Sequence, residues 1–292
     1  MDLNGYQDLA SRTDQRPGDD EQALAFPLLG LASEVGSLVN QYKKRVRDGD
    51  AHEMFSNRAA TELGDILWYV ANVAGKLGFR LEDIAVENLR RINERWSADD
   101  AHPPARLLDD DFPPHEQLPR LVDVEFAELM QPDGSLRVVL TSGGQTLGNP
   151  LSDMSWVADD YRYHDAFHLS YAAMLGWSPI ARAFFCRQRE SNPRYREVED
   201  SGRAKVIEEA VAALVFDYAQ EEHYLRNVDA IDFSLLETVQ SITSRFEVRA
   251  RTTREWERAI LRSFEVWEQL RTAHGGTVRL NLRDRAITVV DP

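Results

Sequence analysis

The sequence contains one cysteine and few basic residues, and each shortage excludes a class of protein. Cys186 has no partner, which rules out an intramolecular disulfide and a thiolate zinc cluster and fits a reducing compartment. We expect Cys186 to be a buried thiol without a chemical role. Lysine and arginine number 34 against 49 aspartate and glutamate, giving a net charge of −15. This balance argues against a groove that follows nucleic-acid phosphates and favours a cation-binding protein.

Long apolar runs are also missing. The longest, Ala210–Phe216, is far shorter than the roughly twenty residues that a membrane-spanning helix requires. The first residues, MDLNG, have neither the basic start nor the apolar centre of a secretory signal. We therefore expect a globular, cytoplasmic protein with no membrane and no nucleic acid among its partners. Its 292 residues, 43% of them apolar, suffice for two domains.

Residues 3 to 96 have the pattern of four amphipathic helices. Apolar side chains recur every three or four positions, which places them along one face of each helix. The expected helices run from Leu3 to Arg12, from near Pro27 to Asp48, from Phe55 to Leu77 and from Glu82 to Trp96. Four such helices predict a bundle that occupies residues 1–96.

The remainder of the chain predicts a linker and a second domain. Residues 97–120, rich in proline and aspartate, are expected to form a linker or an irregular wrap. VDVEFAELM and LRVVLTS flank the turn signal QPDG and predict a β-hairpin. A helical pattern follows from about Val157 to Ala273, and TVRLNL and AITVV predict a short closing hairpin. The fold class is therefore mainly α, with residues 121–292 as the second domain.

Acidic side chains in the first domain have the spacing of a metal site. Glu34 and Ser37 share one face of the second expected helix, with Gln41 a turn further on, and Glu62 and Asp65 share a face of the third. Carboxylates brought together between adjacent helices repel one another, and a bound cation offsets that cost. Mg²⁺ takes oxygen ligands from carboxylates, waters and phosphates. From spacing alone, solvated surface acids are an equally good interpretation.

The text around these acids resembles a known family. FPLLGLASEVGSLVNQYKK and ATELGDILWYVANVAGKLGFRLEDIAVENLRRINERW resemble the MazG-like, all-α nucleoside triphosphate pyrophosphohydrolases over roughly residues 3–96. The family pattern is E-E-x-x-E on one helix and E-x-x-D on the next. The second element is intact here as ELGD, from Glu62 to Asp65, whereas the first is SEVGS, from Ser33 to Ser37. Ser37 therefore replaces a carboxylate of the family pattern.

The resemblance implies an activity. Glu34, Glu62 and Asp65 would be the catalytic residues and would bind Mg²⁺, with Mn²⁺ as a substitute. A water held there would attack the phosphorus next to the nucleoside and release pyrophosphate. Ser37 or Gln41 would contribute through water. The resemblance also implies a homodimer or a higher homo-oligomer. The loss at Ser37 leaves a second hypothesis open, a nucleotide-binding sensor whose hydrolytic site has decayed.

Further residues are candidates for binding the nucleotide substrate. By the resemblance, Asn88 and Arg91 match a closing N-x-x-K motif and would meet the phosphates, with arginine where lysine is common. Lys43 and Lys44 are placed to face anions, although a solvated helix end is an equal alternative. Trp68 would border a base pocket in one interpretation, but its helical spacing favours packing in the core.

The second domain contains a histidine pattern. RYHDAFHLSYAAMLGWSP places His164, Asp165 and His168 within two turns of a helix, where histidines four residues apart share a face. Together with Glu209 they suggest a third hypothesis, an independent metal hydrolase. The glutamate of H-E-x-x-H is absent, and the pattern favours buried, hydrogen-bonded histidines over metal ligands. This part of the chain also resembles the C-terminal extension of some MazG-like proteins.

A local group of arginines follows. Its members are Arg182, Arg187, Arg189 and Arg194. They are candidates for binding phosphate or a second nucleotide. Pairing with the nearby acids Glu190, Glu197, Glu199 and Asp200 is the alternative, and it would contribute little to stability if exposed.

Overall fold

The chain divides into two compact units. The computed structural model describes residues 1–96 and 106–291, and its units are Met1–Asn93 and Glu94–Pro292. The described residues are mainly helical and include a five-stranded antiparallel sheet, which lies in the second unit.

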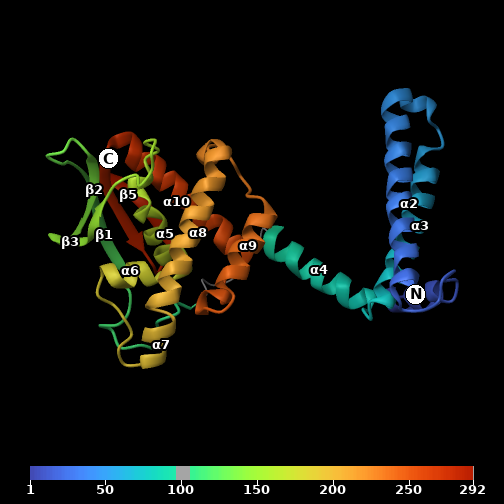
Figure 1. Ribbon diagram of the computed structural model, residues 1–292, viewed down its shortest axis with the longest axis horizontal. Coiled ribbons are helices and arrows are strands. Elements are labelled where there is room, and N and C mark those ends of the chain that lie inside the picture. Colours follow the sequence, from blue (N-terminus) through green and yellow to red (C-terminus); the bar gives the residue numbers. More distant parts are fainter. Residues whose placement is uncertain (97–105, 292) are drawn as a thin grey trace. The chain divides into compact units, whose positions relative to one another are not determined.

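The first unit is built around a pair of long helices. α2 (Glu21–Asp48) and α3 (Phe55–Lys76) lie side by side along most of their length (Figure 1). They are joined by η1 (Gly49–Ala51) and a short turn, and α1 (Leu3–Ser11) packs against α3. A small core forms there from Ala10, Ala71, Ala74 and Leu81. Most contacts between helices of the first unit are therefore those between α2 and α3.

The start of α2 differs from the prediction. The sequence indicated a start near Pro27, but the helix begins at Glu21 and Pro27 lies inside it. Asp20 is the reason, because its carboxylate accepts a hydrogen bond of 2.7 Å from the Ala23 N–H and caps the first turn. Pro27 has no N–H to donate to the carbonyl four residues earlier, and the helix continues through it.

Gly30 allows α2 and α3 to approach closely. A Cβ added at Gly30 would lie 2.2 Å from Cε1 of Tyr69, so the tyrosine ring covers the backbone of α2. Trp68 packs edge to face on Tyr69, with ring centroids 4.9 Å apart. The indole N–H of Trp68 donates to the Thr13 hydroxyl at 2.8 Å. Both rings therefore take part in packing the unit together.

α4 (Leu81–Trp96) is attached to this unit through its N-terminus. The Gln7 side chain accepts from the Leu81 N–H at 3.1 Å and donates to the Phe79 carbonyl at 2.8 Å. Within residues 1–96, α4 does not pack extensively against α2 or α3. Val86 and Leu89 consequently remain 62% and 57% exposed. One chain thus provides three packed helices and a fourth that buries Leu81 at its start but leaves later apolar residues such as Val86 and Leu89 uncovered.

α2 also presents apolar side chains to the outside. The most exposed are Leu29, Val39, Tyr42 and Val46, each at least 60% accessible. The segment Glu21–Ala51 is long and apolar enough to span a membrane by length and composition, with a mean hydropathy of 1.4 and 11% of its apolar window buried. It was not expected from the sequence, because Glu34 and small polar residues interrupt the apolar run. Such a surface usually marks an interface.

The five strands of the second unit form one sheet. They are β1 (Leu121–Met130), β2 (Leu136–Ser142), β3 (Gln145–Leu151), β4 (Gly275–Asn281) and β5 (Ala286–Asp291). The order is β3-β2-β1-β4-β5, and all neighbours are antiparallel. Val124 of β1 lies opposite Val278 of β4, so the first and fourth strands in the sequence pair at the centre of the sheet. The sequence predicted neither β3 nor this pairing.

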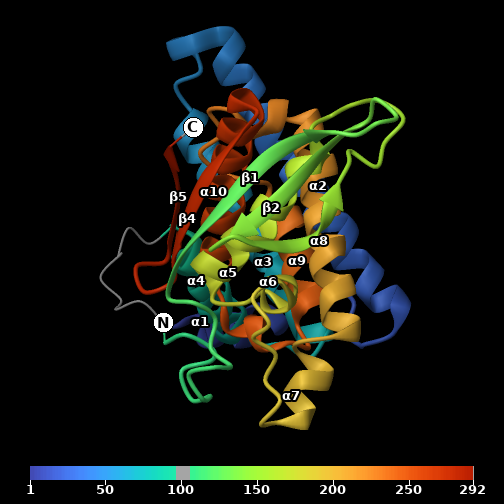
Figure 2. The same cartoon turned by 90° about the vertical axis from the view of Figure 1, so that its left-hand side faces the viewer.

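Helices cover one face of the sheet (Figure 2). In chain order they are η2 (Tyr161–Tyr163), α5 (Asp165–Leu175), α6 (Pro179–Phe184), α7 (Pro193–Val198), α8 (Gly202–Glu221), η3 (His223–Leu225), α9 (Phe233–Thr243), η4 (Glu247–Ala250) and α10 (Thr253–Ala273). α5 and α10 pack on each other and on β4 and β5, and α5 also contacts α8. α5 is buried on nearly all sides, so its polar side chains lie in the interior.

Residues 106–120 wrap onto the second unit without forming a helix or strand. Leu118 is 2% exposed and joins the main core, and Asp109 is 1% exposed. Of the two forms predicted for the proline-rich segment, these residues take the irregular wrap. Residues 97–105 of that segment lie outside the part of the chain that the structure describes.

Candidate metal centres

The first cluster lies between α2 and α3. Glu34 comes from α2, and Glu62 and Asp65 come from α3, one turn apart. One carboxylate oxygen from each residue lies within 4.8 Å of the other two. Glu34 and Glu62 are half-buried, and Asp65 is exposed. The structure thus brings together the three acids that the sequence singled out, and we call them the acid cluster.

The acid cluster is electrostatically unfavourable without a cation. Partial burial, a hydrogen bond with Glu62 and the charges of Asp65 and Glu62 raise the pKa of Glu34 above its usual range. A proton or a metal ion reduces the repulsion. A divalent ion reduces it more, because it contributes two positive charges among the three carboxylates.

Gln41 adds a further oxygen to this cluster. Its side chain is 8% exposed, and its Nε2 donates to Glu62 Oε1 at 3.4 Å. Its Oε1 is buried and accepts no hydrogen bond from any described residue. Buried amide oxygens are rarely left without a partner, and a metal ion or its bound water would supply one. Ser37 is half-buried on the same helix, between Glu34 and Gln41. The donor set is entirely oxygen, which suits Mg²⁺.

The other residues predicted for the nucleotide lie apart from one another. Lys43 is exposed and Lys44 half-buried towards the end of α2. Asn88 and Arg91 are exposed on α4, which does not pack extensively on α2 or α3 within residues 1–96. One chain therefore does not bring Asn88 and Arg91 to the acids.

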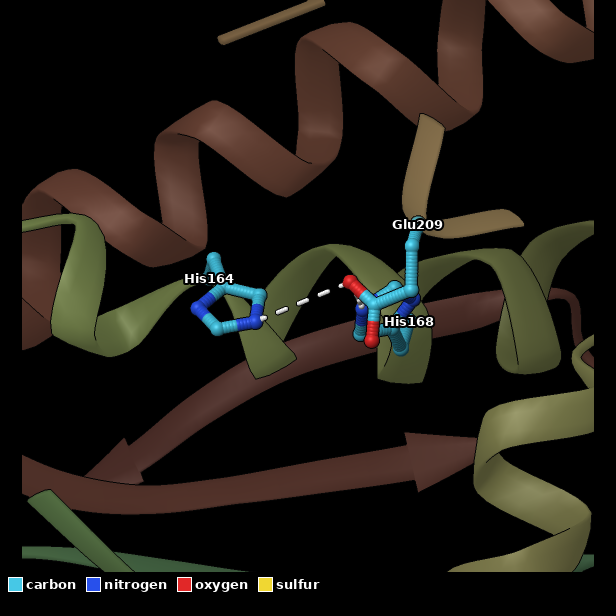
Figure 3. A group of neighbouring side chains, drawn as sticks. All are labelled: His164, His168 and Glu209. Atoms are coloured by element: carbon cyan, nitrogen blue, oxygen red, sulfur yellow. Dashed lines mark ion pairs between the residues drawn. The ribbon is translucent and has the colours of Figure 1, made fainter. Parts of the chain in front are cut away.

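The second cluster consists of His164, His168 and Glu209, and we call it the histidine cluster. His164 precedes α5, His168 lies one turn into it, and Glu209 comes from α8. Their side chains point towards one another (Figure 3), with ligand atoms all within 4.8 Å. Glu209 Oε2 lies 4.0 Å from His164 Nε2 and 3.4 Å from His168 Nε2. Asp165 Oδ1 is 3.9 Å from His164 Nε2.

Both histidines are buried and hydrogen-bonded, as the sequence pattern favoured. His164 Nδ1 lies 2.9 Å from the Tyr161 carbonyl oxygen, and His168 Nδ1 lies 3.0 Å from Glu208 Oε1. Since both partners are acceptors, each Nδ1 carries the proton. Glu208 is fully buried and also accepts from the Ser178 hydroxyl at 2.5 Å and the Ile180 N–H at 2.9 Å. The sequence pattern did not predict this role for Glu208.

Burial and charge act in opposite directions in the histidine cluster. Burial lowers the pKa of His168, but the charge and hydrogen bond of Glu208 and the nearby Glu209 outweigh it and raise the pKa to about 10. Burial and the charge of His168 lower the pKa of His164 to about 4. Burial raises the pKa of Asp165 to about 7. Without a metal, a proton on His168 would therefore balance the surrounding carboxylates.

Two of the four arginines in the predicted group form buried ion pairs. Arg189 pairs with Asp200 at 2.6 Å and with Glu247 at 2.7 Å, and Arg182 pairs with Asp109 at 2.9 Å. Of these acids, only Asp200 was among the predicted partners. The remaining members are Arg187, which donates to the His115 carbonyl at 2.7 Å, and Arg194, which is exposed. The buried pairs favour the structural interpretation over a free phosphate site.

Cys186 is exposed, contrary to the prediction. It lies in the turn just after α6, where the backbone has a φ of 52°. The chain turns away from the core at this point, so the thiol is directed to the surface rather than packed.

The fold and the two clusters define a mainly helical protein that carries two groups of side chains with the composition of metal sites. Residues 103–292 match the model of the MazG C-terminal domain, and the chain belongs to that family. The chain is also similar to the Gene 37 protein of Mycobacterium phage L5, at 36% identity over 101 residues, which covers 32% of this chain and 89% of that protein. No solved structure matches the chain. This match confirms the predicted resemblance of the second half of the chain to the C-terminal extension of MazG-like proteins.

Proposed function

We propose that the chain hydrolyses a nucleoside triphosphate to a monophosphate and pyrophosphate at the acid cluster, with Mg²⁺. The observation that carries the proposal is the approach of Glu34, Glu62 and Asp65 within 4.8 Å, from two helices whose sequences resemble the pyrophosphohydrolases. Membership of a MazG family supports a nucleotide-related function. The buried Oε1 of Gln41, without a partner among the described residues, supports an ion or its water at this place.

Bound Mg²⁺ would lower the pKa of a water molecule and neutralise charge on the triphosphate. Glu62 and Asp65 would hold the ion from α3, and Glu34 from α2. Gln41 restricts the orientation of Glu62 through their 3.4 Å contact. In the reaction the water oxygen forms a bond to the α-phosphorus. The bond from that phosphorus to the bridging oxygen breaks, pyrophosphate leaves with the electron pair, and the proton of the water passes to solvent.

A homodimer is part of this proposal. The uncovered apolar side chains of α2 and α4 include Leu29, Val39 and Leu89, each at least 57% exposed. A second copy packed on them would complete a four-helix bundle and would bring Asn88 and Arg91 of one copy near the acids of another. A lipid bilayer is a less favourable partner than a second copy for the apolar side chains of α2. The three carboxylates close to α2 would enter the bilayer, where each charge costs roughly 3 kcal/mol or more. We accordingly expect the protein in the cytoplasm, where triphosphates and Mg²⁺ are available.

The sensor hypothesis depends on Ser37. The cluster has one carboxylate fewer than the family pattern, so its affinity for Mg²⁺ would be lower unless substrate phosphates complete the shell. A sensor would bind triphosphate with Mg²⁺ and release no pyrophosphate. In that case S37E, which restores the carboxylate, should produce measurable turnover.

The test is incubation of the full chain with each common NTP and dNTP and Mg²⁺, followed by quantification of monophosphate and pyrophosphate. We expect equal amounts of the two products from at least one triphosphate, and a loss of at least about 100-fold in E62Q. E53Q is the matched control, because Glu53 is exposed in the loop between α2 and α3. Unchanged turnover in E62Q would remove the acid cluster from the reaction.

A further inference from the structure

The two buried histidines both place Nε2 near Glu209, and hydrogen bonding within the described residues leaves Nε2 of His168 without a partner. In both rings Nδ1 is engaged by an acceptor, so Nε2 is the nitrogen that carries the lone pair when the ring is neutral. His168 is completely buried, and its Nε2 has no hydrogen-bond partner in residues 1–96 or 106–291. The nearest acid is Glu209, at 3.4 Å. A buried nitrogen of this kind needs either a proton shared with that carboxylate or another partner.

The surroundings of His168 match the arrangement around metal-bound histidines. Such rings usually donate the other N–H to a carboxylate or a carbonyl, which fixes the tautomer and the ring orientation. Glu208 has this position for His168, and the Tyr161 carbonyl has it for His164. Glu208 is itself held by the Ser178 hydroxyl and the Ile180 N–H, so the orientation is rigid. The Tyr161 ring also stacks on His164, with centroids 4.3 Å apart.

The spacing of the ligand atoms fits a single ion. Metal–ligand bonds of about 2.0–2.1 Å at tetrahedral angles place two ligand atoms about 3.4 Å apart. Glu209 Oε2 is 3.4 Å from His168 Nε2 and 4.0 Å from His164 Nε2, and one ligand atom of each residue lies within 4.8 Å of the others, so the three side chains would close slightly around an ion. Glu209 is able to move, because its side chain is 51% exposed while that of His168 is 0% exposed.

We propose that His164, His168 and Glu209 bind one divalent transition-metal ion through their two Nε2 atoms and one carboxylate oxygen. Asp165, predicted with them, lies beside the site with Oδ1 3.9 Å from His164 Nε2 and is not one of the converging ligands. Two imidazoles and a carboxylate select ions such as Zn²⁺, Fe²⁺, Mn²⁺ or Co²⁺ over Mg²⁺. The site differs in chemistry from the acid cluster, whose donors are all oxygen. Its ligands reach solvent on the side of Glu209, which leaves room for a water or a substrate oxygen on the ion.

Charge supports a cation at this place. The carboxylates of Asp165, Glu208 and Glu209 surround two histidines in an interior where unbalanced charge is costly. A divalent ion bound to neutral histidines supplies the positive charge that would otherwise require protonation of the rings. The metal and the proton therefore compete for the same Nε2 atoms.

The test uses the full chain, freed of metal with a chelator and titrated with Co²⁺ in a buffer that contains excess Mg²⁺ to occupy oxygen sites. We expect one Co²⁺ per chain, with d–d absorption bands that indicate nitrogen ligation. E209Q should weaken binding by at least about 10-fold. E221Q is the matched control, with the same substitution at an exposed position of the same helix, and should bind as the wild type does.

The proposal is wrong if the wild type takes up no stoichiometric Co²⁺, or if E209Q binds it as tightly as the wild type. A second measurement guards against misfolding. Zn²⁺ should raise the melting temperature of the wild type and of E221Q but not of E209Q, and equal shifts in all three would also contradict the proposal. E62Q, which alters only the acid cluster, should retain Co²⁺ binding. The outcome is therefore independent of the proposed pyrophosphohydrolase activity.

Discussion

Buried charges in the second unit form ion pairs and networks. A single substitution that removes one charge measures how much stability depends on its partner. Arg189 and Asp200 are both 0% exposed and lie 2.6 Å apart. Phe112 and Tyr195 lie against the guanidinium, at 5.0 and 4.8 Å from their ring centroids. Removing one charge from such a pair leaves the other buried without full compensation, which costs more than the pair contributes as a whole.

We therefore predict that D200N lowers the free energy of unfolding by about 3 kcal/mol or more. E190Q is the control, because it breaks the exposed pair between Glu190 and Arg196 and should change stability by less than about 1 kcal/mol. Urea denaturation of both variants gives the comparison. Similar small effects in the two variants would mean that the buried network contributes little.

Glu199 makes the free energy of unfolding depend on pH. Burial raises its pKa to about 7, despite the hydrogen bond it accepts from the Glu247 N–H at 3.1 Å. The folded pKa lies above the unfolded value of 4.5, so the folded state binds more protons between these two pH values. Its contribution to stability is thus complete below pH 4.5 and is lost as the pH rises towards 7.

E199Q cannot titrate, so its free energy of unfolding should fall less than that of the wild type between pH 5 and pH 7. Chemical denaturation across this range measures the difference in slope. Parallel curves for the two proteins would show that Glu199 titrates normally in the folded state.

At the scale of elements, α2 and α3 are held together where side chains are small. Gly30 is covered by Tyr69, whereas a Cβ added at Gly36 on the same helix would contact nothing within 4 Å. Alanine is favoured over glycine within a helix by about 0.5–1 kcal/mol. The two glycines should thus respond oppositely to the same substitution.

G36A should stabilise the first unit by about 0.5–1 kcal/mol. G30A should destabilise it, because the tyrosine ring must move out of the contact, and Y69L should reduce that loss in the double variant. Thermal unfolding of the three variants provides the test. Equal stabilisation by G30A and G36A would contradict the close approach of α2 and α3.

The sequence predicted these elements unequally. α3 was predicted almost to the residue, since its apolar stripe from Leu63 to Val73 is regular and Gly78 follows it. β3 was missed because its sequence, QTLGNPL, contains glycine and proline and alternates poorly. The pairing of β1 with β4 joins residues about 150 positions apart, and no local pattern encodes such a contact.

The candidate sites also differ in how far the sequence predicted them, according to whether their contacts are local or come from tertiary packing. Glu34, Glu62 and Asp65 were predicted from their spacing on two consecutive helices together with the resemblance of the surrounding sequence to the pyrophosphohydrolases. Glu208 was not assigned a role, because its contact with His168 spans 40 residues and depends on how α5 meets α8. Contacts within an element or between adjacent elements were therefore predictable, and those made by tertiary packing were not.

For the whole molecule, the uncovered face of α2 is the surface on which we propose that a second copy packs. Val39 is 60% exposed in the single chain, so V39E should leave the fold of one copy intact. We predict that the wild type is a dimer or larger in solution and that V39E is monomeric, with pyrophosphate release reduced by the loss of the partner. V206E, at a 66% exposed valine of α8, is the control and should retain the wild-type mass.

Sedimentation velocity measures these masses. A monomeric wild type would contradict the dimer while leaving the acid cluster available within one chain. An oligomer unaffected by V39E would place the contact elsewhere on the molecule.

We propose that the acid cluster directs water to the α-phosphorus of a triphosphate. Turnover of an accepted triphosphate with Mg²⁺ in water enriched in ¹⁸O tests it most directly, with mass spectrometry of both products. We predict that one ¹⁸O enters each nucleoside monophosphate and none enters pyrophosphate. Label in pyrophosphate, or release of orthophosphate in its place, would show that water attacks a phosphorus other than the α-phosphorus.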